Sequence, residues 1–358
     1  MKVKIGDLTK IKTGKLDANA SSEDGQYPFF TCSKEPLKIS TYSYDCECVL
    51  VAGNGDLNVK YYNGKFDAYQ RTYIIENNSD GKLYMPYLYL FMEEYVEELR
   101  RQAIGGVIKY IKLGNLTDAM IELPSVEEQR NIVKILFKAK QILEQREIEL
   151  EKLDELIKAR FVEMFGNPDV NEKNWNVYKM EQLCEVGSSK RIYQNDQSLT
   201  GIPFLRISDL VNRMDTGSKD CDLFIPEELF EKFKKQGLVP ARGDILLTAR
   251  GTLGRCYIIQ DDDEFYFQDG MITWLSKFDE KITPLYISYL FEMPEFRKQI
   301  DSLQAGSTVA YLSISMTKEL NVMVPPLELQ NQFAAFVAQT DKSKFEIQKS
   351  LEKTQLLF

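Results

Sequence analysis

The chain has 358 residues, 44% apolar and 28% charged, with a formal net charge of −9. This is the composition of a globular protein, and the length is sufficient for two domains. The sequence contains no histidine, which excludes Ser-His-Asp and Cys-His nucleophile sites and histidine-ligated metal sites. No apolar run reaches the roughly 18–20 residues that span a bilayer, and the first ten residues lack the apolar core of a signal peptide, so we expect a cytoplasmic protein.

The first half of the chain has a mixed pattern followed by a long helical one. Short buried strands are expected within "CVLVAG" and "RTYII", and a helix over 85–102. A long helical segment starts after Pro124, and Glu127 and Glu128 suit its first turn. We therefore assign 1–123 to a first domain and 124–165 to a first helical spacer.

The second half repeats this order after a linker. The linker, "FGNPDVNEKNW", is rich in turn-forming residues. Strands are expected within "DILLTA" and "CYIIQ", and a helix over 284–303. A second proline-initiated helix then begins, so we assign 166–323 to a second domain and 324–358 to a second helical spacer.

The two halves are copies of one unit. Gln129 aligns with Gln330 at an offset of 201 residues, and the same offset aligns "AIGGVIKYI" with "QAGSTVAYL". An offset of 196 aligns "VLVAGNGDL" with "ILLTARGTL". A period this long is too large for a solenoid repeat. It indicates a domain-plus-helix unit that is present twice.

The long helices carry apolar residues at alternating steps of four and three, which is a heptad seam. The seam residues are Ile132, Leu136, Leu143, Leu150, Leu153 and Ile157 in the first helix, and Phe333, Val337, Ile347, Leu351 and Phe358 in the second. We expect an α+β fold in which two mixed domains are joined by an antiparallel coiled coil with internal pseudo-twofold symmetry, so that the domains lie at opposite ends of a rigid spacer. Two separate helices, each packed on its own domain, are the alternative.

Motifs for catalysis or cofactor binding are incomplete. "VAGNGDLN" lacks the third glycine of a dinucleotide loop, and no Gly-Lys-Ser/Thr follows. "NPDV" lacks the second proline and the aromatic residue of an amino-methyltransferase motif. The six cysteines form no C-x-x-C pair, so a zinc site is not expected. We predict no catalytic residue, no metal and no cofactor in this chain.

Polar loops recur at matching places in both copies and carry groups that bind phosphates and base edges. The candidate DNA-binding residues are Lys12, Thr13, Lys15, Ser33, Lys34, Asn54, Tyr69, Gln70, Arg71 and Lys109 in the first domain, and Ser188, Ser189, Lys190, Arg191, Arg206, Ser208, Arg250, Thr252, Gln268, Ser307 and Thr308 in the second. Arg250, Gln70 and Asn54 are the candidates for base contacts. The net charge of −9 does not oppose this hypothesis, because global charge does not determine the charge of one face.

The sequence resembles the specificity subunit of Type I restriction–modification enzymes over its whole length. "GIPFLRISDL", "RGDILLTARGTLGRCYII", "LQAGSTVAYLS" and "VPPLELQNQF" are similar to a second recognition domain and its helical region. "YPFFTC", "VLVAGNGD", "IGGVIKYI" and "LPSVEEQRNIV" are similar to another recognition-domain subtype and its helix. One departure is that the second helix stops at Phe358, the counterpart of Ile157.

The resemblance implies a non-catalytic subunit with two target recognition domains, each reading half of a bipartite double-stranded DNA sequence. It also implies docking of two modification subunits, which methylate adenine with S-adenosylmethionine, and through them of restriction subunits that use ATP and Mg²⁺. Two other hypotheses remain: a coiled-coil scaffold that binds proteins without DNA specificity, which the acidic charge favours, and a self-contained enzyme.

Overall fold

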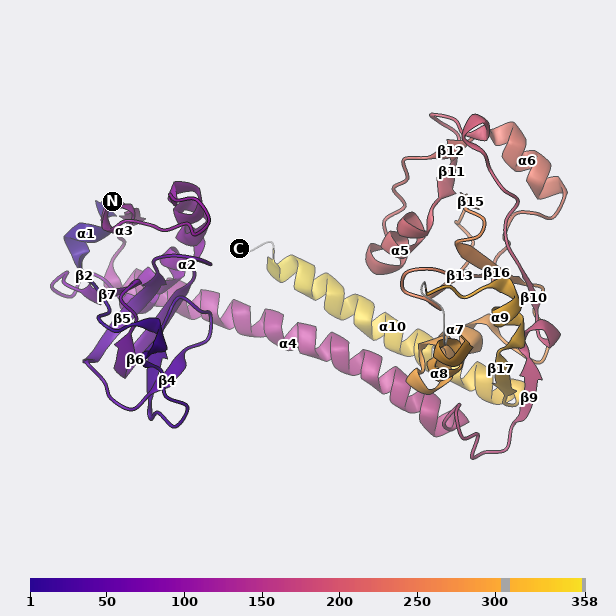
Figure 1. Ribbon diagram of the computed structural model, residues 1–358, viewed down its shortest axis with the longest axis horizontal. Helices are drawn as coiled ribbons and strands as arrows, with labels where there is room; N and C mark the ends of the chain where they lie inside the picture. The colour runs from indigo at the N-terminus through magenta and orange to yellow at the C-terminus, as the bar shows by residue number, and fades with distance from the viewer. Residues whose placement is uncertain (304–309, 356–358) are drawn as a thin grey trace. The chain divides into compact units, whose positions relative to one another are not determined.

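The computed structural model describes residues 1–303 and 310–355. The chain separates into two compact units, unit 1 (Met1–Glu144) and unit 2 (Gln145–Phe358). Both units mix helices and sheets (Figure 1), which is the α+β class expected from the sequence. None of the helices in the described residues is long and apolar enough to cross a membrane.

Unit 1 contains a six-stranded sheet, a two-stranded sheet and several helices. Its strands are β1 (Lys2–Lys4), β2 (Thr9–Thr13), β3 (Tyr27–Phe30), β4 (Leu37–Ile39), β5 (Tyr44–Ala52), β6 (Val59–Ala68), β7 (Thr72–Asn77) and β8 (Met120–Glu122). Its helices are α1 (Ile5–Leu8), the 3-10 helix η1 (Ala18–Ala20), α2 (Met85–Gln102) and α3 (Leu113–Thr117), followed by the long helix α4 (Val126–Phe165), which continues into unit 2.

The six-stranded sheet of unit 1 has the order β2-β7-β5-β6-β3-β4 and is antiparallel except where β3 pairs with β6. Successive side chains of a strand point to opposite faces of a sheet. In β5, Val49 and Val51 accordingly pack with Leu88 of α2, while Leu50 packs with Phe66 in a second core on the other face. Burial on both faces explains the uninterrupted apolar run of this strand.

Unit 2 contains smaller sheets. Its strands are β9 (Asn176–Lys179), β10 (Glu185–Gly187), β11 (Ile202–Leu205), β12 (Phe224–Ile225), β13 (Ile245–Thr248), β14 (Cys256–Ile258), β15 (Tyr266–Phe267), β16 (Ile272–Ser276) and β17 (Asn321–Val324). Its helices are η2 (Met180–Gln182), η3 (Gln194–Asp196), α5 (Ile207–Thr216), α6 (Glu227–Lys235), α7 (Pro284–Glu292), α8 (Pro294–Leu303), α9 (Ile314–Glu319) and α10 (Leu327–Gln355).

Two sheets of unit 2 have the orders β10-β16-β13-β14 and β12-β11-β15. The strand β13 is buried on both faces, like β5: Ile245 and Leu247 belong to the main core, and Leu246 to a core on the other side. The single helix expected over 284–303 is wrong, because the chain forms α7 and α8 with Met293 between them. Pro294 causes this break, since proline has no N–H to donate and restricts the residue before it.

The first strand of each domain pairs antiparallel with the strand that precedes the long helix. Val3 of β1 lies opposite Ile121 of β8, and Tyr178 of β9 lies opposite Val322 of β17. These four residues occupy equivalent places in the two copies of the sequence. The duplication therefore extends to the register of strand pairing.

A buried glutamine attaches each long helix to its domain. The side chain of Gln129 accepts a hydrogen bond from the Tyr84 N–H (2.8 Å) and donates to the carbonyls of Lys82 (2.8 Å) and Pro124 (2.9 Å). It is fully buried. All three partners are backbone groups, two of which immediately precede α2, so the amide joins the start of α4 to the start of α2.

Gln330 makes the same contacts in unit 2. It accepts from the Thr283 N–H (2.8 Å) and donates to the carbonyls of Lys281 and Pro325 (both 2.9 Å). It is 1% exposed. The aligned glutamines of the sequence are thus equivalent in structure.

Within unit 2, α10 runs antiparallel to the C-terminal part of α4, and Figure 1 shows the two helices side by side. The Phe333 ring lies 5.5 Å from that of Phe161 and 5.4 Å from that of Phe165. Further along α10, Lys344 forms an ion pair with Asp154 (2.5 Å). Residue numbers rise along α10 as they fall along α4, which confirms the antiparallel pairing.

The seam residues differ in burial. Ile157, Phe333, Val337 and Leu351 are buried; Ile132, Leu136, Leu143, Leu150, Leu153 and Ile347 are half-buried; Phe358 lies outside the described residues. Large apolar side chains between these positions, such as Ile135 and Phe345, are exposed (67% and 64%). The heptad pattern therefore coincides with the less exposed side of each helix.

The contacts of Gln330 predict a specific loss of stability. Replacing Gln330 by Leu removes the partner of the Thr283 N–H and of two carbonyls. Only the groups that stay shielded from water are costly, at about 1–3 kcal/mol each, and Lys281 and Thr283 are half-buried. We expect Gln330→Leu to lower the free energy of unfolding of unit 2 by about 2–5 kcal/mol. Both tryptophans of the chain, Trp175 and Trp274, lie in unit 2, so urea unfolding followed by tryptophan fluorescence reports on this unit.

Gln339→Leu is the matched control, because Gln339 is an exposed glutamine of the same helix. An equal shift of the urea midpoint in both variants would contradict the structural role of the buried amide.

Candidate nucleic-acid interface

The polar loops of unit 1 meet at one place. The Gly14 N–H donates to the Thr72 carbonyl (3.0 Å), and the Gly53 N–H donates to the Arg71 carbonyl (2.8 Å). These bonds join the loops 12–15, 53–56 and 69–72. A Cβ atom at Gly53 would lie 2.3 Å from the Arg71 carbonyl oxygen, so only glycine permits this approach.

Two more loops join the same place. The Cys32 thiol lies 2.9 Å from Oδ1 of Asn54, and the Asn58 side chain donates to the Cys32 carbonyl (2.8 Å). The Gly55 N–H donates to the Lys109 carbonyl (3.0 Å). We refer to the segments 12–15, 31–34, 53–56, 69–72 and 105–110 as loop cluster 1.

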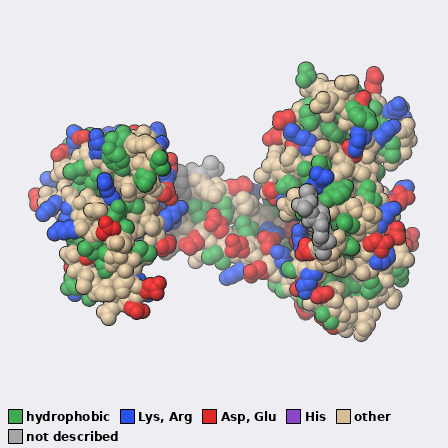
Figure 2. All heavy atoms as spheres, in the orientation of Figure 1, with side chains coloured by type: hydrophobic (Ala, Val, Ile, Leu, Met, Phe, Trp, Pro, Cys, Tyr) green, Lys and Arg blue, Asp and Glu red, His purple; other side chains and the backbone are tan. Residues whose placement is uncertain are grey.

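Loop cluster 1 presents cations to solvent. Lys15, Lys34, Arg71 and Lys109 are exposed, and none of them forms an ion pair with another described residue. Unpaired lysine and arginine side chains are the groups that contact DNA phosphates. On the face drawn in Figure 2, basic and acidic side chains are interspersed over unit 1, so this cationic character is local.

The polar loops of unit 2 also meet. The Gln268 N–H donates to the Leu205 carbonyl (2.9 Å), and the Ala249 N–H donates to the Met271 carbonyl (2.9 Å). The Ser189 hydroxyl donates to the Phe267 carbonyl (2.6 Å). We refer to the segments 187–191, 204–209, 248–252, 267–270 and 310–311 as loop cluster 2; the expected residues Ser307 and Thr308 lie outside the described part of the chain.

The two clusters share one backbone arrangement. The Ile111 N–H donates to the Gly53 carbonyl (2.9 Å), and the Leu312 N–H donates to the Ala249 carbonyl (3.0 Å). Next to these bonds, Arg250 pairs with Tyr311 and its guanidinium carbon lies 5.1 Å from the centre of the Tyr311 ring. The equivalent pairing in unit 1 places a neutral residue, Asn54, opposite Tyr110.

In each unit an arginine binds the backbone directly after the glycine-containing turn (53–56 in unit 1, 249–252 in unit 2). This role was not predicted from the sequence. The Arg100 guanidinium donates to the Leu57 carbonyl (3.0 Å), and the Arg297 guanidinium donates to the Leu253 carbonyl (2.6 Å). Both arginines come from the helix that precedes the last loop of their domain. The two arginines are 197 residues apart, so neither the 196-residue nor the 201-residue offset aligns them, and the sequence repeat did not indicate their shared role.

Some predicted DNA contacts in unit 1 are engaged within the protein. Lys12 forms an ion pair with Glu76 on the neighbouring strand β7, and its amino group lies 4.7 Å from the centre of the Tyr44 ring. Lys12 is therefore engaged within the sheet, and its contact with DNA stays a prediction. Asn54 is half-buried, and its side-chain oxygen faces Cys32.

Serines 188 and 189 are structural. Ser189 is 9% exposed, and its hydroxyl donates a hydrogen bond to the Phe267 carbonyl. The Ser188 hydroxyl donates to the Ile272 carbonyl (3.1 Å). Their hydroxyls join the segment after β10 to β16 and β15, so both have structural partners, and their contact with DNA stays a prediction.

Two predicted arginines of unit 2 are paired with acids. Arg206 binds both carboxylate oxygens of Asp209 (2.9 and 3.1 Å) at the start of α5. Arg191 binds Asp269 at 2.8 Å. In both pairs the adjacent charge raises the pKa of the arginine above its ordinary value, mainly through the hydrogen bond to the carboxylate. Both guanidinium groups therefore have carboxylate partners within the protein, and their contact with DNA stays a prediction.

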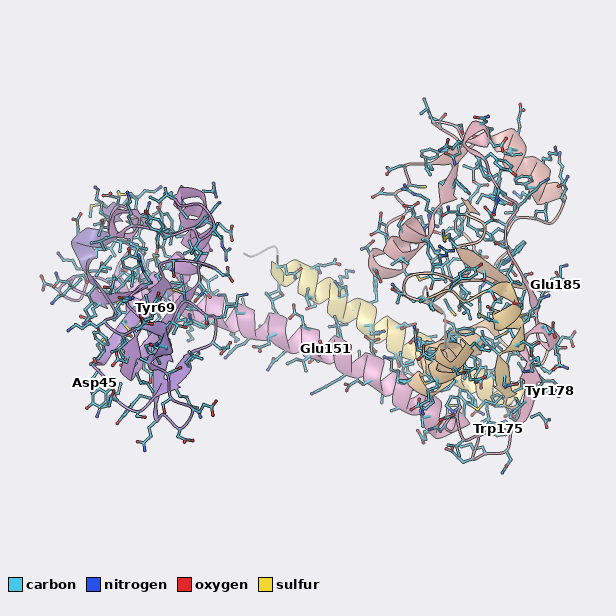
Figure 3. The ribbon with its side chains drawn as sticks, in the orientation of Figure 1. Asp45, Tyr69, Glu151, Trp175, Tyr178 and Glu185 are labelled. Atoms are coloured by element: carbon cyan, nitrogen blue, oxygen red, sulfur yellow. The ribbon has the colours of Figure 1, made fainter. Side chains whose placement is uncertain are left out.

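The other candidates lie at the surface of the loop clusters. Tyr69, which Figure 3 labels, is half-buried, as is Gln268, whereas Thr13, Ser33, Gln70, Lys190, Ser208, Arg250 and Thr252 are exposed. Among the described residues Arg250 has no acidic partner within ion-pair distance. It differs in this from Arg191 and Arg206, the other arginines of loop cluster 2, which are paired with acids.

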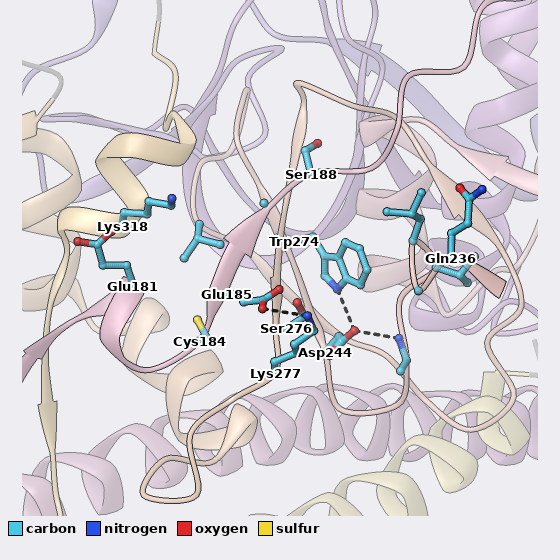
Figure 4. Close-up of a pocket in the computed structure, with 16 residues that line it drawn as sticks. Glu181, Cys184, Glu185, Ser188, Gln236, Asp244, Trp274, Ser276, Lys277 and Lys318 are labelled. Carbon is cyan, nitrogen blue, oxygen red and sulfur yellow. Dashed lines mark hydrogen bonds and ion pairs between the residues drawn. The ribbon is translucent and has the colours of Figure 1, made fainter. Parts of the chain in front are cut away.

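A cavity of about 720 Å³ lies beside β10 and β16 (Figure 4). Its most buried charged group is Asp244, which accepts hydrogen bonds from the Trp274 indole (2.8 Å) and the Ala241 N–H (2.9 Å). Burial raises the pKa of the Asp244 carboxyl above its ordinary value. No group of three or more metal-ligating side chains occurs in the described residues, and the bonds of Asp244 are those of a structural carboxylate.

The family model for the Type I restriction modification DNA specificity domain matches residues 1–152 and 172–356. Among curated proteins, the chain is 40% identical to the Type I restriction enzyme EcoDI specificity subunit of Escherichia coli over 156 residues, which is 44% of this chain and 34% of that protein. It is 25% identical to a putative Type I restriction enzyme specificity subunit of Haemophilus influenzae over 328 residues, which is 87% of this chain and 80% of that protein.

Solved structures of low sequence identity share the fold. The Type I restriction–modification S subunit from M. genitalium matches with a TM-score of 0.64 at 16% identity, covering 100% of this chain and 93% of that one. A chain from a structure on complex assembly and conformational transition of the Type I system matches with a TM-score of 0.56 at 14% identity, covering 99% and 96%. The family model covers both copies of the repeated unit, and the chain belongs to the family of Type I restriction–modification DNA specificity subunits.

Proposed function

We propose that this non-catalytic subunit reads a bipartite DNA sequence, with loop cluster 1 on one half-site and loop cluster 2 on the other. The observation that carries the proposal is the repeated construction of the clusters, in which equivalent backbone bonds hold loops of different sequence: Ile111 to Gly53, and Leu312 to Ala249. A shared scaffold with different side chains suits two readers of different sequences.

The same proposal assigns the chemistry to partner subunits. Modification subunits that dock on this chain would methylate adenine with S-adenosylmethionine, and restriction subunits bound through them would use ATP and Mg²⁺. A protein with this role acts in the cytoplasm, where the DNA is. The alternative function, a protein-binding scaffold without DNA specificity, is favoured by the net charge of −9.

Exchange of one domain tests the assignment of half-sites. Replacing residues 1–123 by the recognition domain of another family member should change one half of the methylated sequence and preserve the other, because each cluster is built within its own unit. The measurement is methylation-aware sequencing of DNA from cells that carry the modification complex. A change in both halves contradicts the two-reader model, and methylation without any sequence preference supports the scaffold alternative.

Substitution of Arg250 tests the nature of its contact. If Arg250 binds a base edge, Arg250→Ala should cost about 1–3 kcal/mol of discrimination and relax one position of one half-site. Binding to a library of single-base variants of the target measures this effect. Arg242→Ala is the control, since Arg242 is an exposed arginine of the same unit that pairs with Asp261. Equal weakening on every sequence would instead make Arg250 a phosphate contact.

An insertion in α4 tests whether this helix determines the gap between the half-sites. The helix has 40 residues, and seven added residues lengthen a helix by about 10 Å while keeping the heptad pattern in phase. Inserted between Glu144 and Gln145, they should lengthen the non-specific gap by about three base pairs at 3.4 Å each. The sequence of the methylated sites gives the gap directly. An unchanged gap would exclude α4 as its determinant.

A further inference from the structure

The loop between α2 and α3 has an apolar tip in solvent. Ile104 and Tyr110 exchange two backbone hydrogen bonds (3.0 and 2.9 Å), which makes 104–110 a small hairpin. At its tip Val107 is fully exposed (105%) and Ile108 is 62% exposed. Two adjacent β-branched apolar side chains that lie mostly in solvent at the end of a hairpin add little to the core, and this placement suits a contact with a partner.

The hairpin is held inside loop cluster 1. The Lys109 carbonyl accepts from the Gly55 N–H (3.0 Å), and the Ile111 N–H donates to the Gly53 carbonyl (2.9 Å). Both bonds come from the C-terminal leg of the hairpin, which is therefore fixed to the turn at 53–56. Lys109 and Arg71 are exposed in the same cluster. This arrangement is complementary to a DNA duplex: the cations can contact the phosphates, and the apolar tip between them can contact apolar groups on the base edges.

We propose that Val107 and Ile108 contact base pairs of the half-site read by unit 1, and that the apolar group they recognise is the 5-methyl of thymine. The inference rests on the proposed DNA-reading function. The major groove admits a two-stranded ribbon and exposes the thymine methyl, which apolar side chains contact. If adenine is the methylated base, each half-site contains at least one A·T pair and hence a thymine.

The glycines of the hairpin provide an internal test of its geometry. Gly105 has φ +119°, and a Cβ there would lie 2.6 Å from the Ile108 carbonyl oxygen. A Cβ at Gly106 would meet no atom within 4 Å. Gly105→Ala should displace Ile108 from its position, whereas Gly106→Ala should preserve the hairpin.

The experiment uses the full chain with its modification subunit and duplexes that carry its own target. Replacing thymine by uracil in the unit 1 half-site removes only methyl groups. Wild type should lose affinity on the order of four-fold for each methyl group contacted, and the Val107→Ser/Ile108→Ser variant should bind both duplexes equally. The variant should also keep the salt dependence of wild type, while Lys109→Ala should reduce its slope by about 0.9 if Lys109 contacts a phosphate.

Controls separate the outcomes. Met120→Ser changes an exposed apolar residue of unit 1 on β8 and should leave thymine discrimination intact, as should Gly106→Ala. Gly105→Ala should weaken thymine discrimination.

If wild type distinguishes target from random DNA but the double variant still prefers thymine, the inference is overturned and the proposed function stands. Loss of modification-subunit binding with unchanged DNA discrimination also overturns it, because the tip would then be a protein contact. If wild type does not distinguish its target at all, the proposed function itself fails.

Discussion

A buried amide at the start of each long helix is the contact on which the rest of the architecture depends. The buried side chains of Gln129 and Gln330 each bind three backbone groups. A buried backbone group without a partner is costly, so the helix cannot slip or rotate on its domain without breaking several bonds. The aromatic contacts of Phe333 with Phe161 and Phe165 then continue the attachment along α10 in unit 2.

The loop clusters extend from the same rigid construction. Each rests on a strand buried on both faces, β5 or β13, and on an arginine, Arg100 or Arg297, that binds the backbone of the turn. These supports are shared by the two units, whereas the exposed side chains differ. A support that is shared by both units and carries different exposed side chains allows recognition to change without a change of fold, which is the arrangement expected of a specificity subunit.

The fold was largely predictable because duplication made each half a test of the other. The aligned glutamines indicated equivalent helix starts, and the structure has them in α4 and α10. The expected continuous helix over 284–303 failed at Pro294, where a local backbone restriction overrides a helical pattern. The family resemblance was confirmed by the match of the family model to both copies.

Individual site residues were less predictable, because their partners come from other segments of the chain. Lys12 lies on a strand beside Glu76, and Ser189 meets a carbonyl 78 residues away; neither partner is visible in a loop motif. Arg206 is different, since Asp209 three residues later matches a capping pair at a helix start. That spacing could have indicated a structural arginine.

Genome-wide mapping of methylated bases in cells carrying this chain with its modification subunit tests the central claim most directly. Two separately built readers predict a motif of two specific blocks separated by a non-specific gap of constant length, with a methylated adenine in each block. A single continuous block, or methylation without a defined motif, would contradict the account.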